Sequence, residues 1–260
     1  MIVSEFIKKF EQYFPSNLAY KWDNVGLQVG SDEENITNIL LSLDLTNEII
    51  DEAIEKNANF VVVHHPIIFT PLKQINTNTY LGNLLSKIIK NNINIYVAHT
   101  NFDLSNFGMN KVLADMLEIE DQKIIELETL DEGLGRYGNL NESMSLGKFI
   151  EKVKNVYNLD TVKLISNQKM NYMIGTVAIC GGSGSSLLGN DILKYCDIYI
   201  TGDVTYHHAL DAINRGLTVL DVGHHVERHG ILSIKSQLET FSQDYRVFLS
   251  NLDVNPYKIV

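Results

Sequence analysis

The stretch Phe60-Val61-Val62-Val63-His64-His65-Pro66 decides the fold class of this chain. Its apolar part is short and rich in β-branched residues, which is typical of a strand buried on both faces of a sheet. The run stops at two histidines and a proline. In open α/β sheets the carboxyl ends of the strands line the crevice in which ligands bind. We therefore expect His64 and His65 to lie in a functional site, where adjacent imidazoles could bind two different metal ions.

The rest of the chain alternates predicted strands with predicted helices. Strands are expected at residues 26–30, 36–43, 93–98, 161–165, 174–179, 197–200, 217–220 and 245–249, and helices at the N-terminus and at 46–57, 79–91, 108–117 and 145–157. This alternation predicts an α/β fold, with a parallel or mixed sheet in each of two lobes and helices packed on the sheets. The acidic, irregular segment 118–135 is the best candidate for the lobe boundary.

Composition excludes several classes of function. The chain has 260 residues, of which 45% are apolar, and its formal net charge is −11. Nucleic acid and anionic membranes both need a basic face, so the charge argues against them. No apolar run approaches the ~20 residues of a membrane span, and the N-terminus does not resemble a signal peptide. With two cysteines and no C-x-x-C motif, we expect a reducing, cytoplasmic location.

Histidines mark the ends of the predicted strands. All eight lie at or just beyond a strand end: His64, His65, His99, His207, His208, His224, His225 and His229. Carboxylates accompany them, since Asp103 is four residues after His99, Asp203 is four before His207, and Glu227 is three after His224. If a helix begins near Gly223, the last pair shares one face.

Imidazole and carboxylate without thiolate suit Zn²⁺, Fe²⁺, Mn²⁺ or Co²⁺ and argue against a closed structural zinc site. We therefore predict a metal site built from at least three of these segments. A single histidine at a strand end is usually a hydrogen-bonded loop residue, and we expect this of His208, His225 and His229.

Two further features each leave two interpretations open. The glycine-rich turn 180–186 matches neither common phosphate-binding motif. It could still cradle a phosphate on backbone N–H groups or serve as a tight connection. Trp22 could be a core residue or a pocket wall.

Six motifs give the chain a family resemblance. They are Trp22–Gly30, Val63–Pro66, Ala98–Asp103, Gly181–Gly184, Thr201–His207 and Gly223–Glu227. With these motifs the chain resembles the GTP cyclohydrolase 1 type 2 homolog family, the Nif-three-like or YbgI-like dinuclear metal proteins. The motifs follow the family order over essentially the whole chain.

The resemblance implies a dinuclear site with two divalent metal ions per subunit. His64 and Asp103 would bind one ion, His65 and His224 the other, and Glu227 would bridge both.

The resemblance also implies catalytic roles for His99 and His207 close to the metal ions. The spacing before Glu227 varies by a residue among relatives, so the ligand is His224 or His225. We favour His224 because it follows Gly223 directly.

The implied architecture is two interlinked α/β lobes with mixed sheets flanked by helices, and a metal site at the carboxyl ends of the strands between them. Residues 1–127 with 225–260 would form a discontinuous first lobe, and residues 128–224 the second. The resemblance also implies the toroidal homohexamer of family members, so we expect a homohexamer here.

The family name suggests opening of the guanine imidazole ring of GTP by metal-activated water. We accordingly expect a metal-dependent hydrolase acting on a nucleotide or related small molecule. The alternatives are a non-haem iron oxidoreductase and a non-enzymatic, ring-shaped metal-binding interaction protein.

Overall fold

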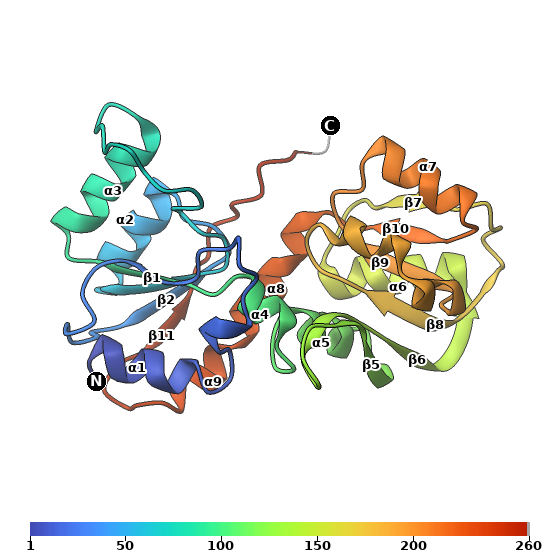
Figure 1. Cartoon of the computed structure of the whole chain (residues 1–260), viewed down its shortest axis with the longest axis horizontal. Coiled ribbons are helices and arrows are strands. Elements are labelled where there is room, and N and C mark those ends of the chain that lie inside the picture. The colour runs from blue at the N-terminus through green and yellow to red at the C-terminus, as the bar shows by residue number, and fades with distance from the viewer. Residues whose placement is uncertain (259–260) are drawn as a thin grey trace. The chain divides into compact units, whose positions relative to one another are not determined.

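The computed structural model describes residues 1–258 and divides into two units. Unit 1 comprises Met1–Phe102 with Ile231–Lys258, and unit 2 comprises Asp103–Gly230. Each unit has its own sheet with parallel and antiparallel pairs and flanking helices (Figure 1). The predicted α/β class with two mixed sheets is therefore confirmed.

The sheet of unit 1 has five strands in the order β1-β4-β3-β2-β11. Their bounds are β1 Gly26–Val29, β2 Ile39–Ser42, β3 Phe60–Val63, β4 Asn94–Val97 and β11 Val247–Leu249. The strands β11, β2, β3 and β4 are parallel, and β1 is antiparallel to β4. The three central strands β2, β3 and β4 are buried along their whole length, as the continuous apolar run at Phe60 predicts.

Helices cover both faces of this sheet. The helices of unit 1 are α1 (Val3–Phe10), α2 (Asn47–Glu55), α3 (Tyr80–Lys90) and α9 (Lys235–Glu239), with a 3₁₀ turn η1 at Ser16–Leu18. Helices α2 and α3 pack on the face that carries Leu40, Val61 and Ile95. On the opposite face α1 places Phe6 against Phe60, with ring centroids 4.8 Å apart. Figure 1 shows α2 and α3 on one side of the sheet and α1 and α9 on the other.

The sheet of unit 2 has six strands in the order β5-β6-β8-β9-β10-β7. Their bounds are β5 Ile119–Leu127, β6 Gly133–Ser145, β7 Lys163–Ile165, β8 Met173–Ile179, β9 Ile198–Thr201 and β10 Val219–Asp221. The flanking elements are α5 (Met109–Met116), α6 (Leu146–Tyr157), α7 (Tyr206–Asn214) and the 3₁₀ turns η2 (Gly184–Gly189), η3 (Asp191–Tyr195) and η4 (His224–Val226). Helices α5 and α6 contact β6 and β8, whereas α7 packs with η2 and β7.

The segment 118–135 is not the irregular boundary that its acidic composition predicted. It forms β5, a short turn and the start of β6. The two strands pair antiparallel, with Ile119 opposite Leu140 and Leu127 opposite Gly133. Ile119 and Ile125 are buried within β5, whereas the acidic side chains of Glu120, Asp121 and Glu126 are exposed to water.

The unit boundaries consequently fall elsewhere than at residues 127/128 and 224/225. Because β5 pairs with β6, residues 119–127 belong to the sheet of unit 2. The chain passes between the units within α4 (Thr100–Leu104) and again within α8 (Glu227–Ser233). Among the helices of residues 1–258, none has the length and apolar character to cross a bilayer.

Neighbouring isoleucines on α3 test the packing of unit 1. Ile88 is fully buried in the core, whereas Ile89 is 55% exposed. We expect Ile88→Ala to lower the free energy of unfolding by about 2–5 kcal/mol, because it removes buried methyl groups and leaves a cavity. Ile89→Ala is the matched control and should change it by less than about 1 kcal/mol. Equal losses in urea denaturation would contradict the assigned face of α3.

Candidate metal centre

Three histidines of unit 1 gather at the carboxyl edge of its sheet. His64 follows β3 directly, His65 is the next residue, and His99 follows β4 after one residue. Because β3 and β4 are parallel and in register, both strands end at this edge. One ring nitrogen of each histidine lies within 4.8 Å of those of the other two. This histidine cluster (His64, His65 and His99) is a candidate site for nitrogen coordination.

Hydrogen bonds orient the rings of His64 and His65. The fully buried His64 places Nδ1 2.7 Å from the backbone oxygen of Ala98. His65 places Nδ1 2.7 Å from Oδ1 of Asp44, which lies just beyond β2. Both acceptors require the proton on Nδ1, so Nε2 of each neutral ring carries a lone pair. These bonds hold both rings in the tautomer that a metal ligand needs.

His99 is held by a buried carboxylate. Its Nδ1 donates to Oδ1 of Asp23 at 2.9 Å. Oδ2 of Asp23 accepts from the backbone N–H of Thr100 at 3.0 Å and from its hydroxyl at 2.6 Å. Burial opposes ionisation of Asp23, but the hydrogen bonds from His99 and Thr100 outweigh it and lower its pKa to about 2. Asp23 therefore stays ionised at neutral pH and keeps Nε2 of His99 as an acceptor.

The donor set fits a divalent transition metal. Burial is the main cause that raises the pKa of the Cys196 thiol to about 11, and the negative charge of Asp197 adds to it. Burial is also the main cause that raises the pKa of the Cys180 thiol well above its ordinary value. Both thiols are protonated at neutral pH and are poor metal ligands. Imidazole nitrogen and carboxylate oxygen remain, and they suit Zn²⁺, Fe²⁺, Mn²⁺ or Co²⁺.

Unit 2 holds a second candidate group around His224. The turn η4 leads into α8, which begins at Glu227, and Nε2 of His224 lies 2.9 Å from Oε2 of Glu227. The predicted i, i+3 pairing of these residues is confirmed. Nδ1 of His224 lies 2.7 Å from Oδ2 of Asp203. A neutral ring has only one N–H for two carboxylates, so this contact calls for a second proton or for a cation shared by His224 and Glu227.

The glycine turn shapes the surroundings of Glu227. Glu227 is 4% exposed, and a Cβ at position 182 would collide with its Oε1. Gly182 also has a φ of +60°, which side chains rarely adopt. The glycine therefore allows the turn to lie close against this carboxylate.

Asp103 lies near the same part of unit 2. Its backbone oxygen accepts from Nδ2 of Asn110 at 3.0 Å. After burial, the negative charges of Asp103 and Glu227 are the largest influences that raise the pKa of the Cys180 thiol. Both carboxylates therefore lie around one buried sulfur.

Four histidines belong to none of the candidate metal-binding groups found among the described residues. They are His207, His208, His225 and His229. His207 is exposed on the first turn of α7, so its predicted catalytic role stays a prediction. His229 donates from Nε2 to the backbone oxygen of Tyr157 at 3.0 Å, and burial lowers its pKa. This is the ordinary structural role expected of His229.

Sequence reasoning missed the carboxylates that orient the rings: Asp23, Asp44 and Asp203. The only signals were the position of Asp23 within the first family motif and of Asp44 at a strand end. Asp203 was associated with His207, whereas it contacts His224. The paired residues are 76, 21 and 21 positions apart, so no local spacing reveals them.

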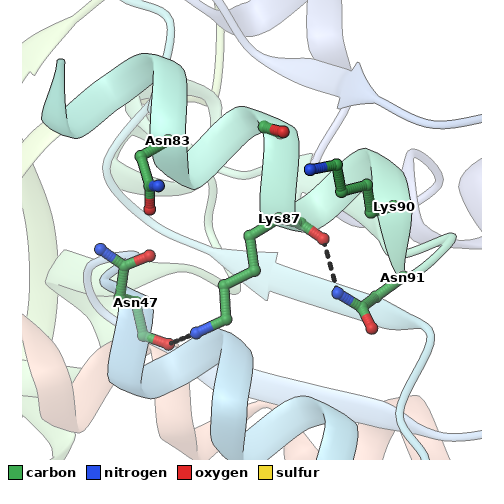
Figure 2. A pocket seen from close by; sticks show the side chains of 6 residues that line it. Asn47, Asn83, Lys87, Lys90 and Asn91 are labelled. Carbon is green, nitrogen blue, oxygen red and sulfur yellow. Dashed lines mark hydrogen bonds between the residues drawn. The ribbon is translucent and has the colours of Figure 1, made fainter. Parts of the chain in front are cut away.

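A separate depression on unit 1 offers no such chemistry. Figure 2 shows it between α2 and α3, lined by Asn47, Asn83, Ser86, Lys87, Lys90 and Asn91. Nζ of Lys87 donates to the backbone oxygen of Asn47 at 2.9 Å and pairs with Asp51 at 2.7 Å. Lys87 is thus already paired, and the residues that line the depression include no histidine, cysteine or carboxylate that could bind a metal ion.

Comparison with known proteins identifies the family. The sequence matches the model of the Duf34/NIF3 (NGG1p interacting factor 3) family over residues 1–256. The chain belongs to the NIF3 family. It is 34% identical to a GTP cyclohydrolase 1 type 2 homolog of Lactococcus lactis, with 99% of both chains covered, and 34% identical to one of Clostridium perfringens, with 100% of both covered.

A solved structure supports the same assignment. A Bacillus cereus protein related to NIF3 superposes with a TM-score of 0.92 at 26% identity, covering 100% of this chain and 99% of that one. The resemblance inferred from the motifs is therefore confirmed, and the NIF3 assignment covers both units.

Asp23→Asn tests the carboxylate that holds His99. An amide nitrogen must face a donor of Thr100 or of His99, so we expect a loss of about 2 kcal/mol in the free energy of unfolding at pH 7. The folded pKa of about 2 lies below the ordinary 3.8. The contribution of Asp23 is therefore complete above about pH 4 and is lost as the pH falls towards 2. Urea denaturation in the presence of a chelator should show the free energies of unfolding of the wild type and the variant converging as the pH falls from about 4 to 2. A difference that stays constant with pH would contradict the role assigned to the Asp23 carboxylate.

Gly182→Ala tests the close approach to Glu227. We expect a loss of about 2 kcal/mol or more, because the methyl group collides with the carboxylate and the backbone is strained. Gly189→Ala is the matched control, since no atom lies within 4 Å of its added Cβ. It should change stability by about 0.5 kcal/mol or less. Similar thermal midpoints for Gly182→Ala and the wild type would refute this account of the turn.

Proposed function

We propose that this NIF3-family chain is a metal-dependent hydrolase that acts on a nucleotide or a related small molecule. The observation that carries the proposal is the orientation of His64 and His65. Each donates Nδ1–H to an oxygen, which puts the lone pair of the neutral ring on Nε2, at the edge of the sheet where ligands collect.

The proposed ligands of two divalent ions are the five residues that the family resemblance implies. His64 and Asp103 would hold one ion, His65 and His224 would hold the other, and Glu227 would contribute its carboxylate to both. The fixed tautomers of unit 1 and the His224–Glu227 contact of unit 2 support this assignment. The native metal is Zn²⁺, Fe²⁺, Mn²⁺ or Co²⁺.

A metal pair would suit an anionic substrate. Two divalent ions would offer phosphate oxygens direct cationic partners in a chain of net charge −11. Such a site can bind phosphate groups that the rest of the surface repels. The names of the relatives make GTP the first compound to test.

When bound, the metal pair supplies Lewis acidity that polarises a substrate oxygen and lowers the pKa of water towards neutrality. His99 accepts a proton at Nε2, and the ionised Asp23 stabilises the resulting imidazolium. His207 is the second proposed proton carrier, from its exposed position on α7.

The location, oligomeric state and partners of the protein are part of the same hypothesis. We propose a cytoplasmic homohexamer with a small-molecule substrate and no membrane or nucleic-acid partner. Light scattering of the purified protein checks the hexamer. A stable assembly that binds metal but leaves every tested compound unchanged would favour the non-enzymatic alternative.

Glu227→Gln tests the metal centre. We expect about two metal equivalents per subunit in wild-type protein purified without chelator or metal-affinity resin. We expect one or none in the variant, because the neutral amide is a weak bridging ligand. The exposed Glu142→Gln is the matched control and should retain both. Elemental analysis gives the content, and release of product from GTP gives the activity.

The other outcomes separate the alternatives. One equivalent of iron with oxygen uptake would favour the oxidoreductase. No metal after reconstitution would refute the proposed centre. Two equivalents without hydrolysis of GTP or of a panel of nucleotides would leave the centre standing and refute the hydrolase.

A further inference from the structure

Trp22 lies on the surface of unit 1 and is not a core residue. Its side chain is 59% exposed, and that of Phe69 is 50% exposed. Grouped large apolar side chains left in water often mark a binding surface. The interpretation of Trp22 as a pocket wall is therefore the one worth developing.

Three aromatic rings form a continuous group, which we call the aromatic platform: Tyr20, Trp22 and Phe69. Tyr20 stacks on Trp22 with centroids 5.6 Å apart and an interplanar angle of 23°. Phe69 lies 5.9 Å from Trp22 at 49°. Aromatic groups of this kind offer π-faces to any planar ring.

Hydrogen bonds on both sides of Trp22 hold it in place. The backbone N–H of Tyr20 donates to Oγ1 of Thr100 at 3.1 Å, and that of Asp23 donates to the backbone oxygen of Tyr20 at 2.9 Å. The carboxylate of Asp23 is bonded in turn to Thr100 and His99. The exposed indole is thus attached to an ordered backbone.

Phe69 is positioned through the residue before it. Ile68 donates its N–H to Oε1 of Gln28 at 2.9 Å, and its backbone oxygen accepts from Nε2 of Gln28 at 3.1 Å. Nδ2 of Asn24 reaches the same oxygen at 2.6 Å. A surface that is already ordered loses little conformational entropy when a ligand binds.

The aromatic platform adjoins the histidine cluster. The ring of Trp22 lies 6.3 Å from that of His99, edge to face. The ring of His99 lies 5.1 Å from that of His64 and 5.8 Å from that of His65. A ring bound on the platform would therefore lie beside the proposed proton acceptor. All of these residues belong to unit 1.

We infer that the aromatic platform is the subsite for the planar heteroaromatic ring of the substrate. The choice of a purine nucleotide rests on the proposed function. Stacking suits this role because every base has a π-face, and aromatic side chains bind splayed bases in this way in other proteins. The platform then selects substrates that carry a ring.

Trp22 is the only tryptophan of the chain, so its fluorescence reports on the platform directly. The probes are guanosine monophosphate and ribose 5-phosphate, which differ by the base. With the metal-loaded protein and correction for absorption, the guanosine nucleotide should quench Trp22 saturably, and ribose 5-phosphate should not. Phe69→Ala should raise the dissociation constant about tenfold, and Phe69→Tyr should restore it.

Two controls complete the experiment. Tyr195→Ala removes a different aromatic ring, 82% exposed in unit 2, and should leave binding unchanged. Trp22→Leu should weaken binding by calorimetry about tenfold, whereas Trp22→Phe should retain most of it.

Several results would overturn the inference. They are equal quenching by both probes, an undiminished affinity in Phe69→Ala and Trp22→Leu, and an indole shielded from acrylamide in the native assembly, which would mean that another copy covers it. The assay measures binding and not turnover. A platform that binds the base without hydrolysis would refute only the hydrolase, and hydrolysis without base-dependent binding would refute only the platform.

Discussion

The parallel alignment of β2, β3 and β4 is the constraint on which the candidate chemistry of unit 1 depends. These strands are buried along their length, so their backbone groups must pair within the sheet. Aspartate and histidine side chains follow where these strands end. The in-register strands stop together, and this brings Asp44, His64 and His99 to one edge although they are far apart in the sequence.

Oxygen acceptors then fix the orientation and the tautomer of each histidine ring. A backbone carbonyl fixes His64, and carboxylates fix His65 and His99, each through Nδ1. A free histidine ring in a loop samples several orientations and both tautomers. Here the unprotonated nitrogens are directed in advance, which reduces the cost of binding a metal ion. In unit 2, the contact between Nδ1 of His224 and Asp203 orients the His224 ring in the same way.

Asp23 connects the histidine cluster to the aromatic platform. One carboxylate oxygen holds His99, and the other holds Thr100 at the start of α4. Thr100 also accepts from the backbone of Tyr20. The same small hydrogen-bond network therefore orders the proposed proton acceptor and the exposed rings beside it. A substrate with a charged part and a planar ring matches these two neighbouring surfaces.

The sequence by itself determined the α/β class, most of the elements, the family and the residues that are chemically suited to bind metal. Continuous apolar runs such as Phe60–Val63 and local spacings such as His224 to Glu227 carry that information, because their physical causes are local. Only the tertiary structure decided that the acidic segment 119–127 is a strand, because its partner β6 supplies the pairing. It also decided which carboxylate orients which histidine, and that Trp22 lies in water and not in the core. Those features arise from contacts between distant segments, and neither composition nor spacing encodes such contacts in a form that a single sequence reveals.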